Sequence, residues 1–235
     1  MSFAILFLLV PIAAIAGWWL SQQRLTAKPW LEVGAIGDIA DTGASSLPAA
    51  TIGLGVFLAV VSSLFALFIS AYFMRMQVAD WAELPAPKIL WFNTGVLILS
   101  SVALQYAHLA ARRGRMEDVV DGLIVGGLFA LTFLFGQFVA WYQLNTAGYF
   151  LATNPASTFF YLFTGLHGMH LLGGLVALGR TTDKVWRGPG LSQVRLSVQL
   201  CALYWHFLLA LWLVLFTLLT PWVGQFAVVC RQLLT

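Results

Sequence analysis

Long apolar runs, separated by short polar stretches, follow one another along this chain. Most of them reach the roughly 20 residues that a helix needs to cross the hydrocarbon core of a membrane. None alternates at every second residue, as the strands of a membrane barrel do. We therefore predict an all-α, polytopic membrane helical bundle of about six transmembrane helices. The six runs are Phe3–Leu20, Ala50–Tyr72, Leu90–Ala110, Gly122–Tyr142, Ser157–Gly179 and Leu196–Pro221.

Lysine and arginine are distributed unequally between the two sides of this predicted bundle. Because cytoplasmic loops of membrane proteins are enriched in these residues, the loops after the first, third and fifth runs are predicted to be cytoplasmic (or matrix-side). Both chain ends are then expected on the outer side. The cytoplasmic group has nine members, namely Arg24, Lys28, Arg112, Arg113, Arg115, Arg180, Lys184, Arg187 and Arg195, and the outer group has three, Arg75, Lys88 and Arg231.

The first run differs from a cleaved signal peptide, which has a positively charged stretch ahead of its apolar segment. Here the charges, Arg24 and Lys28, follow the run, and Trp18 and Trp19 mark that end as interfacial anchors. We expect the run to be a retained helix, followed by a linker along the cytoplasmic surface. Since no internal repeat is found, residues 1–235 are expected to form a single membrane domain.

The composition supports a membrane protein and argues against other classes of function. Of the 235 residues, 60% are hydrophobic and 9% are charged, with a mean hydropathy of +0.88, whereas soluble domains carry about a quarter charged residues. The net charge is only +3, and no basic cluster carries aromatic residues, so nucleic acid is not an expected partner. Cys201 and Cys230 lack the spacing of a disulfide framework or a zinc site and are expected to be unpaired.

Histidines and amides are the main polar candidates within the spans, whose apolar bodies contain no Asp, Glu, Lys or Arg. His167 and His170 are three positions apart and share one helix face, and His206 could approach them from the last span. Three imidazoles could ligate a metal or a haem iron. The interpretation we favour is hydrogen bonding across helices that small residues hold close together. The glycines around the pair are Gly165, Gly168, Gly173 and Gly174.

Two further features indicate helix packing rather than catalysis. Gly122 and Gly126 form a GxxxG step, which allows two helix backbones to approach closely. Gln137 is a lone amide in the fourth span, and we expect it to bond across a helix pair. Because no nucleophile–base pair, paired carboxylates or phosphate-binding glycine loop can be found, we assign no catalytic, cofactor-binding or metal-ligating residue in this chain.

The fifth span is similar to the signature of subunit III of the haem–copper oxidases. It has that family's aromatic pair, then Thr-Gly-x-His-Gly-x-His and a trailing glycine, and the last span resembles its His-Phe-x-x-x-x-Trp element. The resemblance covers about residues 51–224, and Asn154-Pro155 and Gly136-Gln137 also fall where the family has them. The signature positions are Thr164, Gly165, His167, Gly168, His170, Gly173, Gln137, His206, Phe207 and Trp212.

The resemblance implies an accessory, redox-inactive subunit of a terminal oxidase that reduces oxygen to water and pumps protons, with cytochrome c as donor. In that family the haems and copper belong to the catalytic subunit I and its partner subunit II. Subunit III stabilises the catalytic subunit and holds phospholipid in a cleft between its helices. The expected location is the bacterial inner membrane, with the mitochondrial inner membrane as the second choice.

Three other functions remain open on the residues alone. The first is the equivalent subunit of a quinol oxidase or a nitric oxide reductase, since subunit III does not bind the electron donor. The second is a membrane cytochrome whose histidines ligate haem. The third is a small-molecule transporter, which is disfavoured because neither an internal repeat nor a charged or broken helix is found at the midplane.

The sequence departs from the family in three places. Many members carry a membrane-embedded Glu three residues after Gln137, where this chain has Ala140. Many also carry an acid in the span Ala50–Tyr72, where this chain has Val61 at the matching position. The family commonly has seven or five helices, so the run Phe3–Leu20 has no counterpart in it.

Overall fold

The computed structural model describes residues 48–220, except for 83, 153 and 188–190. The chain divides into two compact units, Met1–Ser46 and Leu47–Thr235, and every described helix belongs to the second. The predicted helix Phe3–Leu20, the linker before Pro48 and Cys230 lie outside the described residues. The prediction of a single domain over the whole chain stays a prediction.

Five long helices make up the described part of the chain, and each is long and apolar enough to cross a membrane. They confirm an all-α membrane bundle, and no strand occurs in the described ranges. The helices are α2 (Ala49–Arg75), α3 (Ile89–Arg113), α4 (Met116–Thr146), α5 (Pro155–Trp186) and α6 (Leu191–Leu219). α2, α3, α4 and α5 extend beyond both ends of their predicted apolar runs, because the polar residues at their ends continue the helix towards the membrane surface. α6 begins five residues earlier than predicted but ends at Leu219, two residues before the predicted end at Pro221.

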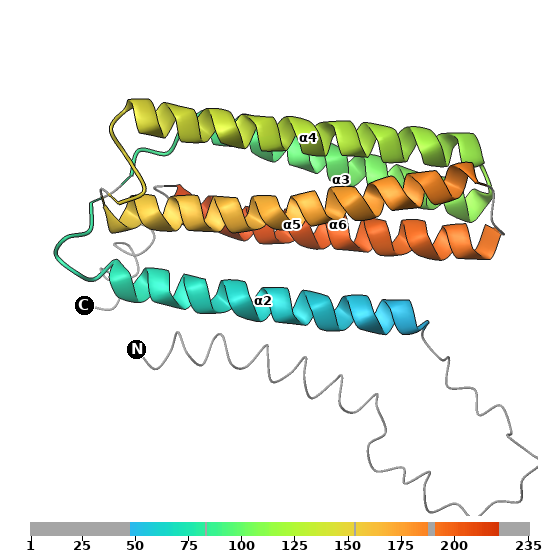
Figure 1. Ribbon diagram of the computed structural model, residues 1–235, viewed down its shortest axis with the longest axis horizontal. Helices are drawn as coiled ribbons and strands as arrows, with labels where there is room; N and C mark the ends of the chain where they lie inside the picture. The colour runs from blue at the N-terminus through green and yellow to red at the C-terminus, as the bar shows by residue number, and fades with distance from the viewer. Residues whose placement is uncertain (1–47, 83, 153, 188–190, 221–235) are drawn as a thin grey trace, which may run out of the picture. The chain divides into compact units, whose positions relative to one another are not determined.

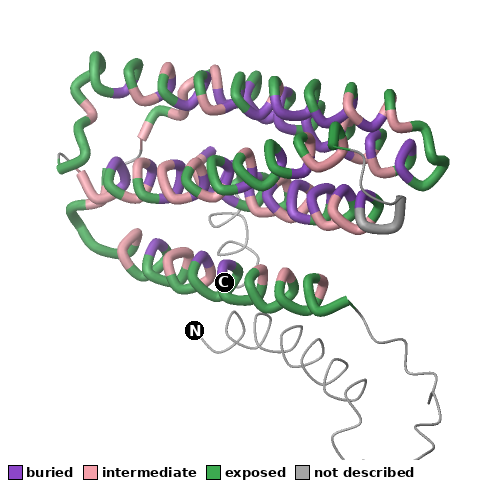
Figure 2. The backbone as a smooth tube through the Cα atoms, turned by 45° about the vertical axis from the view of Figure 1, so that its right-hand side comes forward, coloured by how far each residue is buried: buried purple, intermediate pink, exposed green. Residues whose placement is uncertain are grey.

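Four of the helices form a closed group (Figure 1). α3 packs against α4 and α6, and α5 packs against the same two helices from the other side. Among the described helices, α2 touches only α5 and α6. It also buries little of itself, as Figure 2 shows by its mostly exposed tube. An apolar helix with an exposed apolar surface is the expected result where lipid, rather than water, is the solvent.

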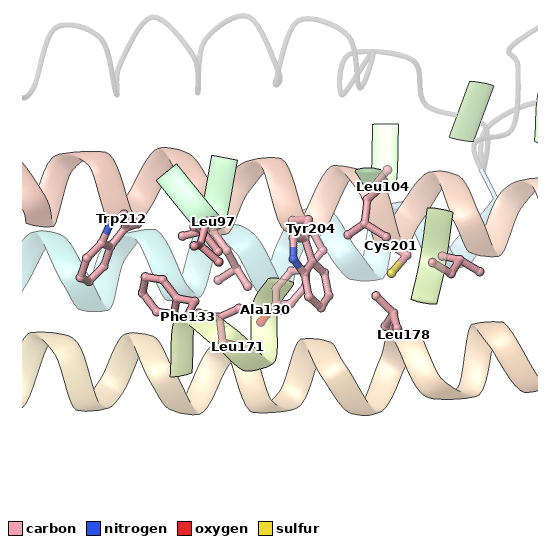
Figure 3. Close-up of a cluster of buried hydrophobic side chains, with 14 of the residues drawn as sticks. Leu97, Leu104, Ala130, Phe133, Leu171, Leu178, Cys201, Tyr204 and Trp212 are labelled. Carbon is pink, nitrogen blue, oxygen red and sulfur yellow. The ribbon is translucent and has the colours of Figure 1, made fainter. Parts of the chain in front are cut away.

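The core of the four-helix group is apolar and rich in aromatic rings (Figure 3). Phe133 of α4 and Trp212 of α6 meet edge to face, with ring centroids 4.8 Å apart, a geometry that aromatic pairs prefer. α2 contributes to a second, smaller cluster. There Val61, Phe65 and Tyr72 are buried against residues of α5 and α6.

The GxxxG step brings α3 and α4 into backbone contact, as predicted. A Cβ atom added to Gly122 would lie 2.8 Å from the Cβ of Ala107, and one added to Gly126 would lie 2.9 Å from Cγ of Leu104. Both distances are too short for any larger residue without movement of a helix. The close α3–α4 contact therefore depends on Gly122 and Gly126 having no side chain.

The connections between helices are set by local chemistry. α3 ends at Gly114, whose φ of 77° lies in the left-handed region that glycine tolerates best. α5 begins after Asn154, whose Oδ1 accepts from the N–H of Ala156 at 2.9 Å and whose Nδ2 donates to the carbonyl of Ala82 at 2.7 Å. Asn154 thus caps its own helix and ties the α2–α3 connection to it.

An ion pair follows α2 at the opposite end from the cationic loops. Nη1 of Arg75 donates to Oδ1 of Asp80 at 2.6 Å, and this hydrogen bond holds the pKa of the Asp80 carboxyl below its ordinary value. Both side chains are substantially exposed, so the pair adds little to stability.

We predict that Gly122→Ala destabilises the protein by about 1–3 kcal/mol, because the added methyl group overpacks the α3–α4 contact. The matched control is Gly95→Ala on α3, where an added Cβ meets nothing within 4 Å. The control is expected to leave stability unchanged or slightly raised, because alanine favours the helix. Thermal unfolding of the full chain in detergent measures both; equal midpoints for the two variants would contradict the close contact.

Candidate functional site

The signature residues lie on α4, α5 and α6, some inside the four-helix group and others, such as Gly173, at its surface. Thr164, His167, Gln137 and Trp212 are buried, whereas His170, His206 and Phe207 are only partly so. The two signature segments therefore face each other within the bundle. The individual side chains nevertheless have different surroundings, described in turn below.

His167 is fully buried and packs between two aromatic rings. Its ring centroid lies 5.8 Å from that of Phe133 and 5.3 Å from that of Trp212. Neither ring nitrogen has a hydrogen-bond partner among the described residues. The prediction that His167 bonds across helices was wrong, because aromatic rings rather than acceptors surround it.

His170 lies one turn further along α5 and turns towards α2. Its Nδ1 donates to the carbonyl of Leu166 on its own helix at 2.7 Å, and its ring lies 5.7 Å from that of Phe65. The carbonyl of His170 accepts from the hydroxyl of Tyr204 on α6 at 2.9 Å. His170 thus joins α5 to two neighbouring helices, through its ring on one side and its backbone on the other.

His206 is the histidine that makes the predicted cross-helix bonds, and its partners are on α3. Its Nε2 lies 3.0 Å from Oε1 of Gln105 and its Nδ1 contacts Oγ of Ser101. A carboxamide oxygen only accepts, so Nε2 carries the proton and Nδ1 accepts from the hydroxyl of Ser101. A neutral imidazole satisfies both bonds, and they fasten α6 to α3.

The three imidazoles therefore point to different partners rather than to a common centre. His167 faces α4 and α6, His170 faces α2, and His206 faces α3. Within the described ranges, no three His, Cys, Asp or Glu side chains come close enough to hold a metal ion together. Sharing one helix face in the sequence does not bring two residues to the same site, because each meets a different neighbouring helix.

Three tryptophans repeat one hydrogen-bonded arrangement that the sequence reasoning missed. In each, the indole N–H donates to a Ser or Thr hydroxyl on a neighbouring helix, and that hydroxyl donates to a backbone carbonyl. Both polar groups of the pair are thereby satisfied inside an apolar core. The three sets are Trp212–Thr94–Leu90 at 3.0 and 2.8 Å, Trp205–Ser100–Gly126 at 2.8 and 2.7 Å, and Trp141–Thr164–Phe160 at 3.0 and 2.7 Å.

Gln137 bonds across a helix pair, as expected. Nδ2 of Asn93 on α3 donates to its Oε1 at 3.4 Å, a long bond. Asn93 can sit there only because the next helix carries glycine, since a Cβ on Gly136 would collide with the Asn93 amide. Gly136 thus makes room for the amide of Asn93, and Gln137 supplies the amide to which it bonds.

The glycines around the two histidines do not all serve close packing. At Gly174, a Cβ would lie 2.8 Å from Tyr204 and 2.9 Å from Trp205, so this glycine admits the aromatic residues of α6. At Gly165 and Gly168 a Cβ would make ordinary contacts, and at Gly173 it would meet nothing within 4 Å. The expectation is corrected for Gly173, which borders an open groove rather than a helix contact.

The two positions at which the resemblance leads us to expect an acid are buried here. Val61 is 3% exposed within the α2 cluster, and Ala140 is fully buried in the main core. An ionised carboxylate at either place would need a partner to offset its desolvation. In this chain an apolar residue fills each place, and the surrounding packing is apolar as well.

We predict that Ser100→Ala destabilises the protein by about 1–3 kcal/mol, because the buried indole N–H of Trp205 loses its acceptor. Ser62→Ala is the matched control, since the exposed Ser62 hydroxyl bonds only to a carbonyl of its own helix. The control is expected to change stability by no more than about 0.5 kcal/mol. Thermal unfolding with tryptophan fluorescence as the readout distinguishes the two, and a change of equal size in both would contradict this role of Ser100.

Comparison with known proteins places this arrangement in a family. The family model described as cytochrome c oxidase subunit III matches residues 44–224, close to the predicted 51–224. A protein named cytochrome c oxidase subunit 3 from Thermostichus vulcanus is 34% identical over 180 residues, which cover 72% of this chain and 85% of that protein.

Other organisms carry similar proteins as well. A probable cytochrome c oxidase subunit 3 from Mycobacterium leprae (strain TN) is 30% identical over 177 residues, which cover 72% of this chain and 86% of that protein. The cytochrome c oxidase subunit 3 of Arabidopsis thaliana is 30% identical over 149 residues, with coverages of 63% and 53%. The chain is therefore a multi-pass protein of the bacterial inner membrane and is associated with an oxidoreductase complex. It belongs to the cytochrome c oxidase subunit III family.

Proposed function

We propose that this chain is the redox-inactive accessory subunit of a proton-pumping cytochrome c oxidase that reduces oxygen to water. The haems and copper would belong to the partner subunits I and II. The observation that carries the proposal is that the signature side chains hold helices together. Thr164, His206 and Trp212 each form a hydrogen bond to a neighbouring helix. Side chains occupied in this way hold a rigid bundle together, and a rigid bundle can support a neighbouring catalytic subunit.

The buried positions Val61 and Ala140 bear on the proton chemistry of the complex. Proton carriers within membranes are ionisable side chains, typically Asp, Glu or His. At the two places where the resemblance to the family leads us to expect carboxylates, this chain has apolar residues. We therefore assign proton transfer to the partner subunits and mechanical support to this chain.

Lipid binding is the second part of the proposal. A groove of about 430 Å³ runs between α2, α5 and α6. It is mostly apolar, and the open surface at Gly173 forms part of its wall. The size and apolar lining of such a groove match a phospholipid acyl chain. Without the groove, the acyl chain could only lie against the outer surface of α2. Its lining residues are Leu54, Phe57, Gly173, Ala177, Thr181, Ser197, Leu200, Cys201 and Tyr204.

We predict that His206→Ala lowers the amount of catalytic subunit recovered with this chain. The change removes the two bonds between α6 and α3, which are worth about 1–2 kcal/mol in membrane proteins. Thr217→Ala on the same helix is the control, because the exposed Thr217 hydroxyl bonds only to its own helix. The measurement is co-purification from membranes, with the visible spectrum of the recovered complex.

The spectrum separates support from haem ligation. Support predicts that the complex surviving in His206→Ala has unchanged haem bands, at reduced yield. A shifted or missing haem band in that variant would mean that the imidazole ligates iron, and the proposal would then fail.

A further inference from the structure

A polar pocket lies between α3 and α6 at the end of the bundle that carries the cationic loops. Its volume is about 580 Å³, which is ample for a phosphate group with a glycerol attached. It is separate from the apolar groove between α2, α5 and α6, with which it shares no residue. The residues that line it are His108, Ala111, Arg112, Arg195 and Gln199.

The described lining of this pocket carries positive charge only. Two arginines face it from different helices, and none of its lining residues is acidic. Neither Arg112 nor Arg195 takes part in an ion pair with any residue that the structure describes. Asp118, in the neighbouring first turn of α4, is already paired with Arg115 at 2.9 Å.

One of the arginines is held in place. Nε of Arg195 donates to the carbonyl of Ala111 at 3.0 Å, so its guanidinium is fixed at the end of α3. This bond leaves the two terminal nitrogens to act as a fork, the geometry with which arginine binds phosphate oxygens. A preorganised guanidinium loses less conformational entropy on binding than a free one.

The donors form two levels, which favours a lipid over a soluble anion. Arg112 is the second-last residue of the apolar span of α3, and Arg195 is the second residue of that of α6, so we place both at the level of the lipid headgroups. His108 and Gln199 are each four residues further into the membrane, or about 6 Å along the helix. This order of donors matches the order of groups in a phospholipid. The two arginines would bind the phosphodiester, and the neutral polar groups one turn deeper would bind the glycerol ester oxygens beneath it.

We propose that this pocket is a binding site for the phosphodiester headgroup of an anionic phospholipid from the cytoplasmic leaflet. Basic pockets between transmembrane helices on that side are suited to such headgroups. The site extends the lipid-binding part of the proposed function. It makes a separate claim about headgroup charge, which the assembly of the oxidase does not test.

The test uses the whole complex, purified through a tag on this chain and stripped of loosely bound lipid. Phosphatidylglycerol or phosphatidylcholine is added back, and native mass spectrometry measures the lipid retained. Each arginine at the membrane surface is worth about a fivefold change in affinity, so Arg112→Gln should weaken phosphatidylglycerol binding about fivefold. The double variant with Arg195→Gln should weaken it about 25-fold.

The control is Arg113→Gln, which removes the same charge one residue away. Arg113 is exposed and does not line the pocket, so its replacement should leave phosphatidylglycerol retention near that of the unaltered complex. An equal loss in Arg113→Gln would show general surface attraction and overturn the site. Equal retention of phosphatidylcholine and phosphatidylglycerol by the unaltered complex would overturn it too.

A competition arm distinguishes lipid from soluble anion. Inorganic phosphate and glycerol 3-phosphate are titrated against bound phosphatidylglycerol, and neither is expected to displace it. Displacement by either at concentrations similar to those of the lipid would assign the pocket to a soluble anion instead. Recovery of the oxidase subunits is followed in parallel, so that a failed headgroup site and a failed subunit assignment give different results.

Discussion

A polar group inside a membrane must find its hydrogen-bond partner within the protein, and this requirement shapes the bundle. Helices satisfy their own backbones, but each buried tryptophan brings an additional N–H donor into the core. In this chain the donor meets a Ser or Thr hydroxyl, which in turn meets a carbonyl. Trp205, Ser100 and Gly126 thereby connect three helices, and the aromatic rings of the core pack around these fixed points.

The same requirement distinguishes the three signature histidines. His206 has Gln105 and Ser101 within reach, so it satisfies both nitrogens and fastens α6 to α3. His170 uses its own helix and turns its ring to α2. His167 has no hydrogen-bond partner among the described residues, and this costs about 1–3 kcal/mol that the surrounding packing must offset. A motif that looks uniform in sequence thus performs three separate structural tasks.

The described helices and a close helix contact at the GxxxG step were predictable from sequence, whereas the partner helix α3 was not, and the site was predictable only in part. An apolar run such as Ala50–Tyr72 and a step such as Gly122–Gly126 are local signals, and both were confirmed. Partners such as Ser100 for Trp205 are 105 residues apart in the chain, so they depend on which helices become neighbours. For the same reason, no local pattern distinguishes Gly174, which admits aromatic rings, from Gly173, which borders a groove.

The central claim is that this chain works as a subunit of a haem–copper oxidase. Affinity purification of the complex from native membranes, through a tag on this chain, tests that claim most directly. The predicted result is a haem–copper catalytic subunit recovered with the chain in near-equal amounts, together with haem absorbance that belongs to that subunit. The contradictory result is a chain recovered without any haem–copper subunit, or one that carries a Soret band of its own.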